Sequence, residues 1–179
     1  MKKLLFAAVV MLFATNMSAQ QLNDLISFSD ILKTNGDFGT LVKTHGFKQA
    51  ELFSGRGAGY FVYYKNCVKK KDNDHPYYKG LTVIPAGIIS IVPFGKGTSI
   101  RITENPPTRY GATVEIEVFN AKAFAQLKED FLRHAKLVGK YYQFKWANGE
   151  IVKEVSLSEY ENGKGGYIQW TIPFDEIFN

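Results

Sequence analysis

The sequence is poor in the residues that build metal centres and disulfide frameworks. It has one cysteine and three histidines among its 179 residues. A single cysteine excludes an internal disulfide and a zinc cluster built from cysteines. His45, His75 and His134 are not spaced like the ligands of a metal ion. We therefore predict no metal site, and nothing in the sequence indicates a cofactor.

Glycine-rich loops of the kind that bind phosphates are also lacking. Gly55-Arg56-Gly57-Ala58-Gly59 precedes a tyrosine-rich strand, whereas a dinucleotide loop needs a helix there. Gly95-Lys96-Gly97-Thr98 has no Ser or Thr directly after the lysine and no glycine five positions before it. Cys67 and His75 could form a thiol and base pair, but no orienting third residue can be named. The sequence thus predicts no catalytic residue and favours a protein that is not an enzyme.

Long apolar runs are missing apart from one near the N-terminus. Leu4 to Ala14 is uninterrupted, follows Lys2 and Lys3, and precedes a polar, small stretch that ends at Ala19. The run is shorter than the roughly 20 residues that a membrane-spanning helix needs. This layout is typical of a secretory signal peptide. We predict that residues 1–19 are removed, that no lipoprotein cysteine anchors the product, and that the mature chain is periplasmic or secreted with no transmembrane span.

The charge balance is only weakly basic. The net charge is +5, and it falls to +3 without residues 1–19, which hold two lysines and no acids. A nucleic-acid-binding protein usually shows a stronger basic patch, so we predict no nucleic-acid partner. Apolar residues make up 45% and charged residues 22% of the chain, as in ordinary globular proteins. Residues 20–179 are predicted to form one globular domain.

The first half of the mature chain predicts helix followed by strands. Helical spacing of apolar residues is broken at Asn35-Gly36, and Tyr60 to Tyr64 favours a strand. Residues 81–94 carry no charge, and Pro85 and Pro93 within them exclude one continuous helix or one central strand. This uncharged segment is interpreted as a buried strand or core-crossing segment, with an exposed contact loop as the alternative. The predicted segments are a two-piece helix at 24–46, hairpin strands at 48–54 and 59–66, a polar surface loop at 67–80 and the uncharged segment at 81–94.

The second half repeats this order. Asn120 can cap a helix that Gly139 would end, Asn148-Gly149 is a strong hairpin signal, and Asn105-Pro106-Pro107 is interpreted as a turn. The predicted segments are strands at 98–104 and 111–119, a helix at 121–138, and strands at 140–146, 150–158 and 166–173.

The predicted fold class is α+β, with an antiparallel β-sheet and two main helices packed on one face. A short likeness between Gly55–Phe61 and Gly163–Ile168 indicates two α-then-β units in tandem, as sub-units of about 20–119 and 120–179. The helix-then-hairpin arrangement resembles that of small exported proteins of the β-lactamase-inhibitor type and of small envelope-assembly lipoproteins. The resemblance is one of pattern, and no residue role or function is carried over from it.

Strand alternation predicts an open, polar sheet face. If Phe144, Trp146, Ile168 and Trp170 face the core, their neighbours in sequence face away. Tyrosine on such a face offers a rigid area with a polar tip, onto which glycans can stack. The residues predicted to bind a ligand on this face are Tyr141, Gln143, Lys145, Tyr167, Gln169, Glu115 and Glu117.

The sequence leaves three functions open. The first is a non-enzymatic exported binding or accessory protein with an envelope protein or a glycan as its partner. The second is a small envelope hydrolase acting on glycan or peptide, with Glu115 and Glu117 as its carboxylates. The third is a structural or inhibitory protein that docks on an envelope enzyme or complex through the loops 54–59, 67–80 and 158–166. The oligomeric state is left open.

Overall fold

The protein is described here by a computed structural model that covers residues 25–53, 59–72, 88–94, 98–108 and 111–172. The predicted signal peptide and residues 81–87 of the uncharged segment lie outside this part of the chain. The covered ranges hold an antiparallel sheet of eight strands, a separate two-stranded sheet and three helices. Strands dominate this mixed architecture, which is consistent with the predicted α+β class.

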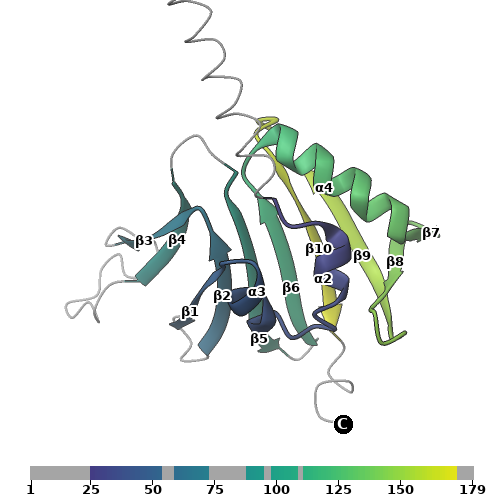
Figure 1. Ribbon diagram of the computed structural model, residues 1–179, viewed down its shortest axis with the longest axis horizontal. Coiled ribbons are helices and arrows are strands. Elements are labelled where there is room, and N and C mark those ends of the chain that lie inside the picture. Colours follow the sequence, from purple (N-terminus) through teal and green to yellow (C-terminus); the bar gives the residue numbers. More distant parts are fainter. Residues whose placement is uncertain (1–24, 54–58, 73–87, 95–97, 109–110, 173–179) are drawn as a thin grey trace, which may run out of the picture.

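The eight-stranded sheet has the order β1-β2-β5-β6-β10-β9-β8-β7 (Figure 1). Each neighbouring pair is antiparallel. β1 and β7 are therefore its edge strands. The bounds of its strands are β1 Lys48–Phe53, β2 Gly59–Lys65, β5 Ile100–Thr108, β6 Gly111–Val118, β7 Lys136–Val138, β8 Tyr141–Lys145, β9 Ile151–Glu159 and β10 Gly166–Ile172. The small sheet pairs β3 Cys67–Asp72 with β4 Ile88–Pro93.

The helices are α2 Phe28–Leu32, α3 Gly39–Thr44 and α4 Ala121–His134. The Asn120 side chain accepts a hydrogen bond from the Ala123 N–H, so the predicted cap of α4 is confirmed. Asn35 and Gly36 have φ values of 51° and 87°, and this left-handed turn breaks the predicted two-piece helix where the sequence indicated. Within the covered ranges, none of the helices has the length and apolar character that crossing a membrane requires.

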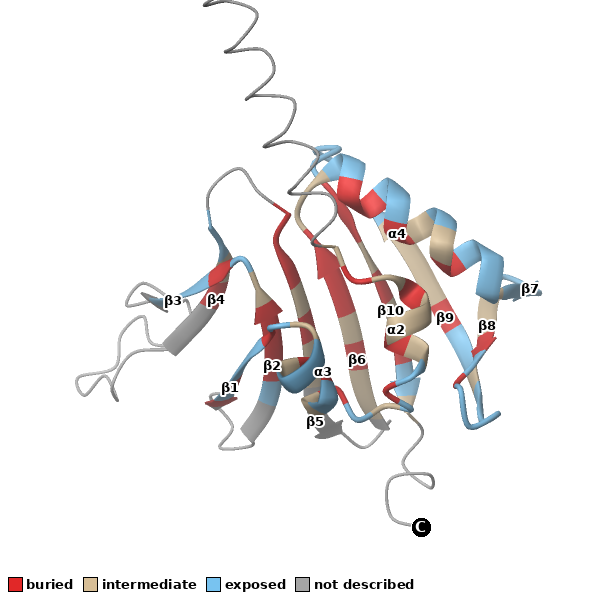
Figure 2. Cartoon of the chain, in the orientation of Figure 1, coloured by how far each residue is buried: buried red, intermediate tan, exposed pale blue. Residues whose placement is uncertain are grey.

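One large apolar cluster, which we call the main core, joins helices and sheet (Figure 2). Phe28 of α2 packs edge to face on Phe131 of α4 and on Phe144 of β8, with ring centroids 5.0 and 5.3 Å apart. Leu41 of α3 and Ile116 of β6 belong to the same cluster. The sheet face that carries the main core is called the core face, and the opposite face is called the outer face.

A smaller apolar cluster lies on the outer face at the β1–β2 side. Tyr63 of β2 joins the main core, whereas its neighbours in the strand point to the other face. β3 and β4 supply one buried residue each to this cluster, so the small sheet packs against the outer face of β1 and β2. We call it the outer cluster, and its members are Ala50, Leu52, Val62, Tyr64, Cys67 and Ile91.

Two predicted irregular segments are strands in the structure. Residues 67–72 form β3 instead of the start of a surface loop, because Asn66 turns the chain at a φ of 54° and β3 then pairs with β4. Asn105-Pro106-Pro107 lies within β5 instead of forming a turn. The register of β5 with β6 shifts between Asn105 and Thr108, and such irregular pairing lets a strand include proline.

The predicted helix 121–138 ends earlier, at His134. Ala135 is already extended, with φ −104° and ψ 148°, and β7 follows directly. Gly139, predicted to end the helix, instead takes a φ of 65° between β7 and β8. Leu137 and Val138 belong to β7, which pairs with β8, and they stay 57% and 45% exposed there.

Candidate functional site

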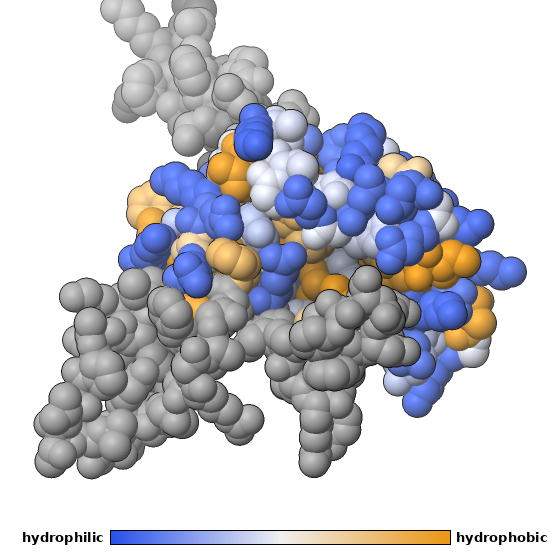
Figure 3. Space-filling view, turned by 90° about the horizontal axis from the view of Figure 1, so that it is seen from below, coloured by the Kyte–Doolittle hydropathy of each residue, from blue (hydrophilic) through white to orange (hydrophobic). Residues whose placement is uncertain are grey.

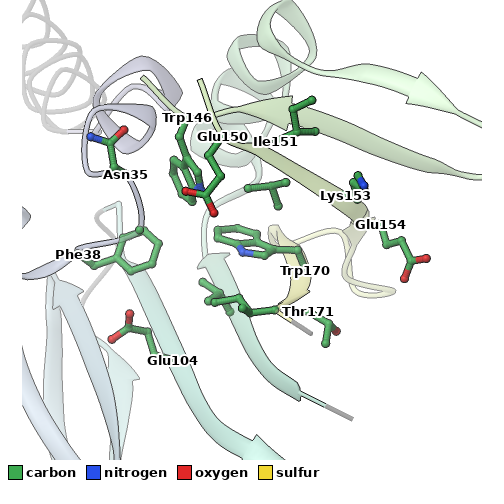
Figure 4. A pocket seen from close by; sticks show the side chains of 14 residues that line it. Asn35, Phe38, Glu104, Trp146, Glu150, Ile151, Lys153, Glu154, Trp170 and Thr171 are labelled. Atoms are coloured by element: carbon green, nitrogen blue, oxygen red, sulfur yellow. The ribbon is translucent and has the colours of Figure 1, made fainter. Parts of the chain in front are cut away.

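A pocket of about 320 Å³ opens on the core face, where the loop after α2 meets the β8–β9 hairpin (Figure 4). Two hydrogen bonds join these segments: the Ala147 N–H donates to the Leu32 carbonyl at 3.1 Å, and the Asn148 N–H donates to Asn35 Oδ1 at 3.0 Å. The lining residues are Asn35, Gly36, Phe38, Glu104, Val114, Trp146, Glu150, Ile151, Val152, Lys153, Glu154, Trp170, Thr171 and Ile172.

Three aromatic rings form the floor of this pocket. The ring centroids of Phe38 and Trp146, and those of Phe38 and Trp170, are 6.3 Å apart, and the two indoles are 5.9 Å apart at 70°. All three side chains belong to the main core and are at most 7% exposed. Because each ring packs against the other two, the floor is rigid, and only a small part of each ring is left for whatever enters.

Glu104 stands beside this floor on β5. Burial raises the pKa of its carboxyl, a hydrogen bond from the Tyr63 hydroxyl lowers it, and the negative charge of Asp37 raises it again, with a net rise. Burial and the neighbouring Glu104 also raise the pKa of the Tyr63 hydroxyl, so that hydroxyl keeps its proton and serves as the donor. A half-buried acid is thus held at the edge of an aromatic surface.

The other rim of the pocket is charged. Glu150, Lys153 and Glu154 come from the β8–β9 hairpin and the start of β9. Glu154 has a φ of 55°, and the register of β8 with β9 shifts in this region. A non-glycine residue in the left-handed region at a strand irregularity is often found beside functional sites. Figure 3 views this end of the molecule from below, with apolar side chains exposed among hydrophilic ones.

The seven residues predicted from the sequence lie on the outer face, away from this pocket. Phe144 and Trp146 join the main core as predicted, so Tyr141, Gln143 and Lys145 of β8 point away from it. On β10 and β6 the register brings the other four together: Tyr167 is opposite Glu117, and Gln169 is opposite Glu115. β9 separates the two groups. Whether any of the seven binds a ligand stays a prediction.

Glu117 is bound by its own neighbours. Its Oε2 accepts from Arg101 Nε at 2.5 Å and also pairs with Nη2, and its Oε1 accepts from the Tyr160 hydroxyl at 2.8 Å. The Arg101 Nη1 donates to the Ile91 carbonyl of β4 at 2.8 Å. The Glu117 side chain is only 9% exposed. This network fastens the small sheet to the outer face, and it leaves Glu117 poorly placed to meet a ligand.

Glu115 and Cys67 are the other titratable groups of this region. Burial, and then the neighbouring Glu117, raise the pKa of the Glu115 carboxyl. Burial raises the pKa of the Cys67 thiol to about 11. At neutral pH the thiol is protonated and buried, which is the opposite of the environment of a nucleophilic cysteine.

The structure does not agree in full with the docking surface predicted for a structural or inhibitory protein. Tyr64, in the strand between the predicted loops 54–59 and 67–80, is 5% exposed and belongs to the outer cluster, so its substitution would disturb packing. The first residues of the loop 67–80 form β3. Tyr77, Tyr78 and residues 54–58 lie outside the described residues.

The pocket residues were not identified as a site from the sequence. Strand alternation predicts that Trp146 and Trp170 lie in the core, which is correct, but it does not show that they border a cavity. Phe38 and Glu104 come from distant parts of the chain and meet the indoles only through the fold. In the part of the chain that the structure covers, no group of three or more His, Cys, Asp or Glu could hold a metal ion.

Comparisons with known proteins give no relative from which a role could be transferred. The chain matches no protein family, no curated protein and no solved structure. The geometry of the pocket is therefore the basis for assigning a function.

Proposed function

We propose that this protein is a non-enzymatic binding protein that holds a small ligand in the pocket floored by Phe38, Trp146 and Trp170. The observation that carries the proposal is the pocket itself, about 320 Å³ in volume with a rigid aromatic floor. That volume is at the lower end of the range of ligand-binding pockets, which are mostly apolar with a few placed polar groups. Glu104 and Asn35 would be such groups here.

Preorganisation supports this proposal. The floor is buried in the main core, and the two segments that form the entrance are joined by the hydrogen bonds from Ala147 and Asn148. A ligand would meet walls that are already ordered, so little conformational entropy would be lost on binding. The proposal treats the chain as one domain with its helices on the core face, built of two α-then-β units.

The place of action proposed here is the cell envelope or the medium. Its basis is the arrangement of Lys2, Lys3, the apolar run Leu4–Ala14 and the stretch ending at Ala19. A periplasmic or secreted binding protein would meet small metabolites or envelope fragments.

The hydrolase alternative draws less support. It depends on Glu115 or Glu117 facing a cleft, yet these residues lie on the outer face and do not line the aromatic pocket. Both carboxylate oxygens of Glu117 are already bonded within the protein. Binding through the core-face pocket is therefore the better supported function.

Binding of a glycan to the outer face is a second candidate. Tyr141, Gln143, Tyr167 and Gln169 remain partly exposed there, while the small sheet packs against β1 and β2. Replacing Tyr141 and Tyr167 by Ala should then abolish retention on cell-envelope glycans. The Trp146→Phe variant should be retained like the wild type.

The pocket is tested by its own fluorescence, because both tryptophans of the chain line it. A library of small apolar and amphipathic compounds is titrated into the mature protein, residues 20–179, while tryptophan emission and the melting temperature are followed. We expect a subset to change the emission and raise the melting temperature. The same compounds should bind Trp146→Phe more weakly and the core variant Tyr142→Phe unchanged. If no compound alters the emission of the folded protein, the proposal is wrong.

A further inference from the structure

We propose that the ligand of the aromatic pocket carries a cationic group on an apolar body. This inference rests on the proposed function, because it names the chemistry of the ligand that the pocket would hold. It is drawn from the position of the carboxylates around the three rings.

Two carboxylates bracket the aromatic floor. Glu150 and Glu104 both line the pocket. In the view of Figure 4 the Glu150 side chain is drawn at the end of the pocket where Trp146 and Trp170 lie, and the Glu104 carboxylate is on the other side of the opening, below Phe38. Glu104 is fixed there by the Tyr63 hydroxyl, and Phe38 packs on the Tyr63 ring with centroids 6.0 Å apart. A group resting on the floor would therefore have a negative charge on two sides.

The rings themselves favour a positive charge. The faces of indole and phenyl rings are electrically negative, and a cation near them is attracted, most strongly by tryptophan. Indole and carboxylate together attract ammonium or guanidinium groups and repel an anion. The apolar lining, which includes Val114, Val152 and Ile172, would hold the body to which the cation is attached.

The charge of the pocket opposes that of the whole chain. The sequence carries a net charge of +5, yet the lining residues include three glutamates and one lysine. The lysine, Lys153, stands on β9, and Figure 4 shows its side chain at the rim of the pocket. Asp37, next to Phe38, adds to the negative potential felt by Glu104. A basic protein with a locally acidic pocket is suited to select a cation there.

The experiment uses three probes of similar size and different charge. Phenethylamine is cationic at pH 7, 2-phenylethanol is neutral and 3-phenylpropanoate is anionic, and each is titrated into the mature protein while tryptophan emission is recorded. We expect phenethylamine to bind about tenfold more tightly than 2-phenylethanol, and the anion to bind most weakly. The preference for the amine should shrink at 1 M salt.

Variants assign the preference to the named carboxylates. Glu150→Gln and Glu104→Gln should each reduce the affinity for phenethylamine about threefold to tenfold and leave 2-phenylethanol unchanged. Glu161→Gln, an exposed glutamate of the β9–β10 connection, is the matched control and should change neither. Glu150 is exposed, so its variant removes a carboxylate without disturbing the main core.

The outcomes separate this inference from the function on which it rests. Equal binding of the three probes, or tighter binding of the anion, would overturn the cationic ligand and leave a binding pocket in place. An amine preference that survives both substitutions would also overturn it. Failure of all three probes to change the emission at millimolar concentration would count against the pocket as a binding site.

Discussion

The two faces of the large sheet are held by different forces. The core face carries the main core, a cluster of aromatic and aliphatic side chains from helices and most strands. The outer face has a small apolar cluster under β3 and β4 and, beside it, the hydrogen-bonded group of Arg101, Glu117 and Tyr160. Apolar burial supplies most of the folding free energy, whereas a buried ion pair mainly fixes how elements are joined. A ligand-binding pocket needs rigid apolar walls. The core face, on which the aromatic pocket opens, supplies them.

The largest expected difference between the faces is in the cost of removing apolar side chains. Phe131→Ala, in the middle of the main core, should lower the free energy of unfolding by about 4 kcal/mol. Ile91→Ala, in the outer cluster, should cost about 2 kcal/mol, because the small sheet can settle closer to β2 and shrink the cavity. Urea unfolding of both variants measures the two losses in free energy of unfolding. Equal costs would show that the small sheet is as integral to stability as the helices.

The ion pair of the outer face should show a smaller effect. Glu117→Gln removes the charge that pairs with Arg101 while keeping the shape of the side chain, and it should cost about 2 kcal/mol. Arg101 is 27% exposed, so solvent limits the loss. The measurement is again urea unfolding at pH 7.

A matched pair serves as the control. Glu159→Gln breaks an exposed ion pair in which Lys128 Nζ lies 2.7 Å from the carboxylate. Because Glu159 is 62% exposed, this variant should cost less than about 0.5 kcal/mol. If the two glutamine variants are destabilised equally, burial of the Arg101–Glu117 pair has no special weight.

Each face carries one half-buried glutamate with a raised carboxyl pKa, and this gives the two faces a shared pH dependence. Glu104 on the core face and Glu115 on the outer face both have carboxyl pKa values above the ordinary 4.5, mainly because of burial. The folded state then binds more protons than the unfolded state between 4.5 and the raised values. Stability from these groups is complete below about pH 4.5 and is lost as the pH rises through the folded values.

Glu104→Gln and Glu115→Gln should therefore each be more stable than the wild type at pH 7, with a smaller advantage at pH 4.5. One carboxyl can contribute a slope of at most about 1.4 kcal/mol per pH unit. Urea unfolding from pH 4.5 to 8 measures the difference between each variant and the wild type, with Glu161→Gln as the control. A variant that loses stability as the pH rises relative to the wild type would contradict the assignment.

Much of the fold can be predicted from the alternation of apolar and polar residues along the strands. This alternation correctly places Ile168 and Trp170 of β10 on the core face, so that Tyr167 and Gln169 point to the other face. Local signals failed where pairing between distant segments decides the structure. Lys69, Lys70 and Lys71 are typical of a loop, yet β4 pairs with them and makes a strand.

The pocket could not be predicted because it is a gap left by the packing of distant segments. Periodicity identifies which side chains leave the solvent, and it correctly sent Trp146 and Trp170 to the core. It does not give the distance between the loop at Asn35 and the hairpin at Glu150, on which the cavity depends. The pairing of Arg101 with Glu117 could have been inferred only after β5 and β6 were aligned in the correct register.

The smallest effect is expected at the β7 edge, where the core face ends. Figure 3 shows apolar surface at the right of the view, on the side of the molecule that carries β7 and β8, and Leu137 of β7 is 57% exposed. Leu137→Ser should change the free energy of unfolding by less than about 0.5 kcal/mol, because little apolar area is buried there. Val155→Ser is the control, because Val155 is fully buried on β9, two strands away from β7. It should lower the free energy of unfolding several times more. A large loss from Leu137→Ser would mean that this edge is covered in solution, and its dependence on protein concentration would show whether a second copy covers it.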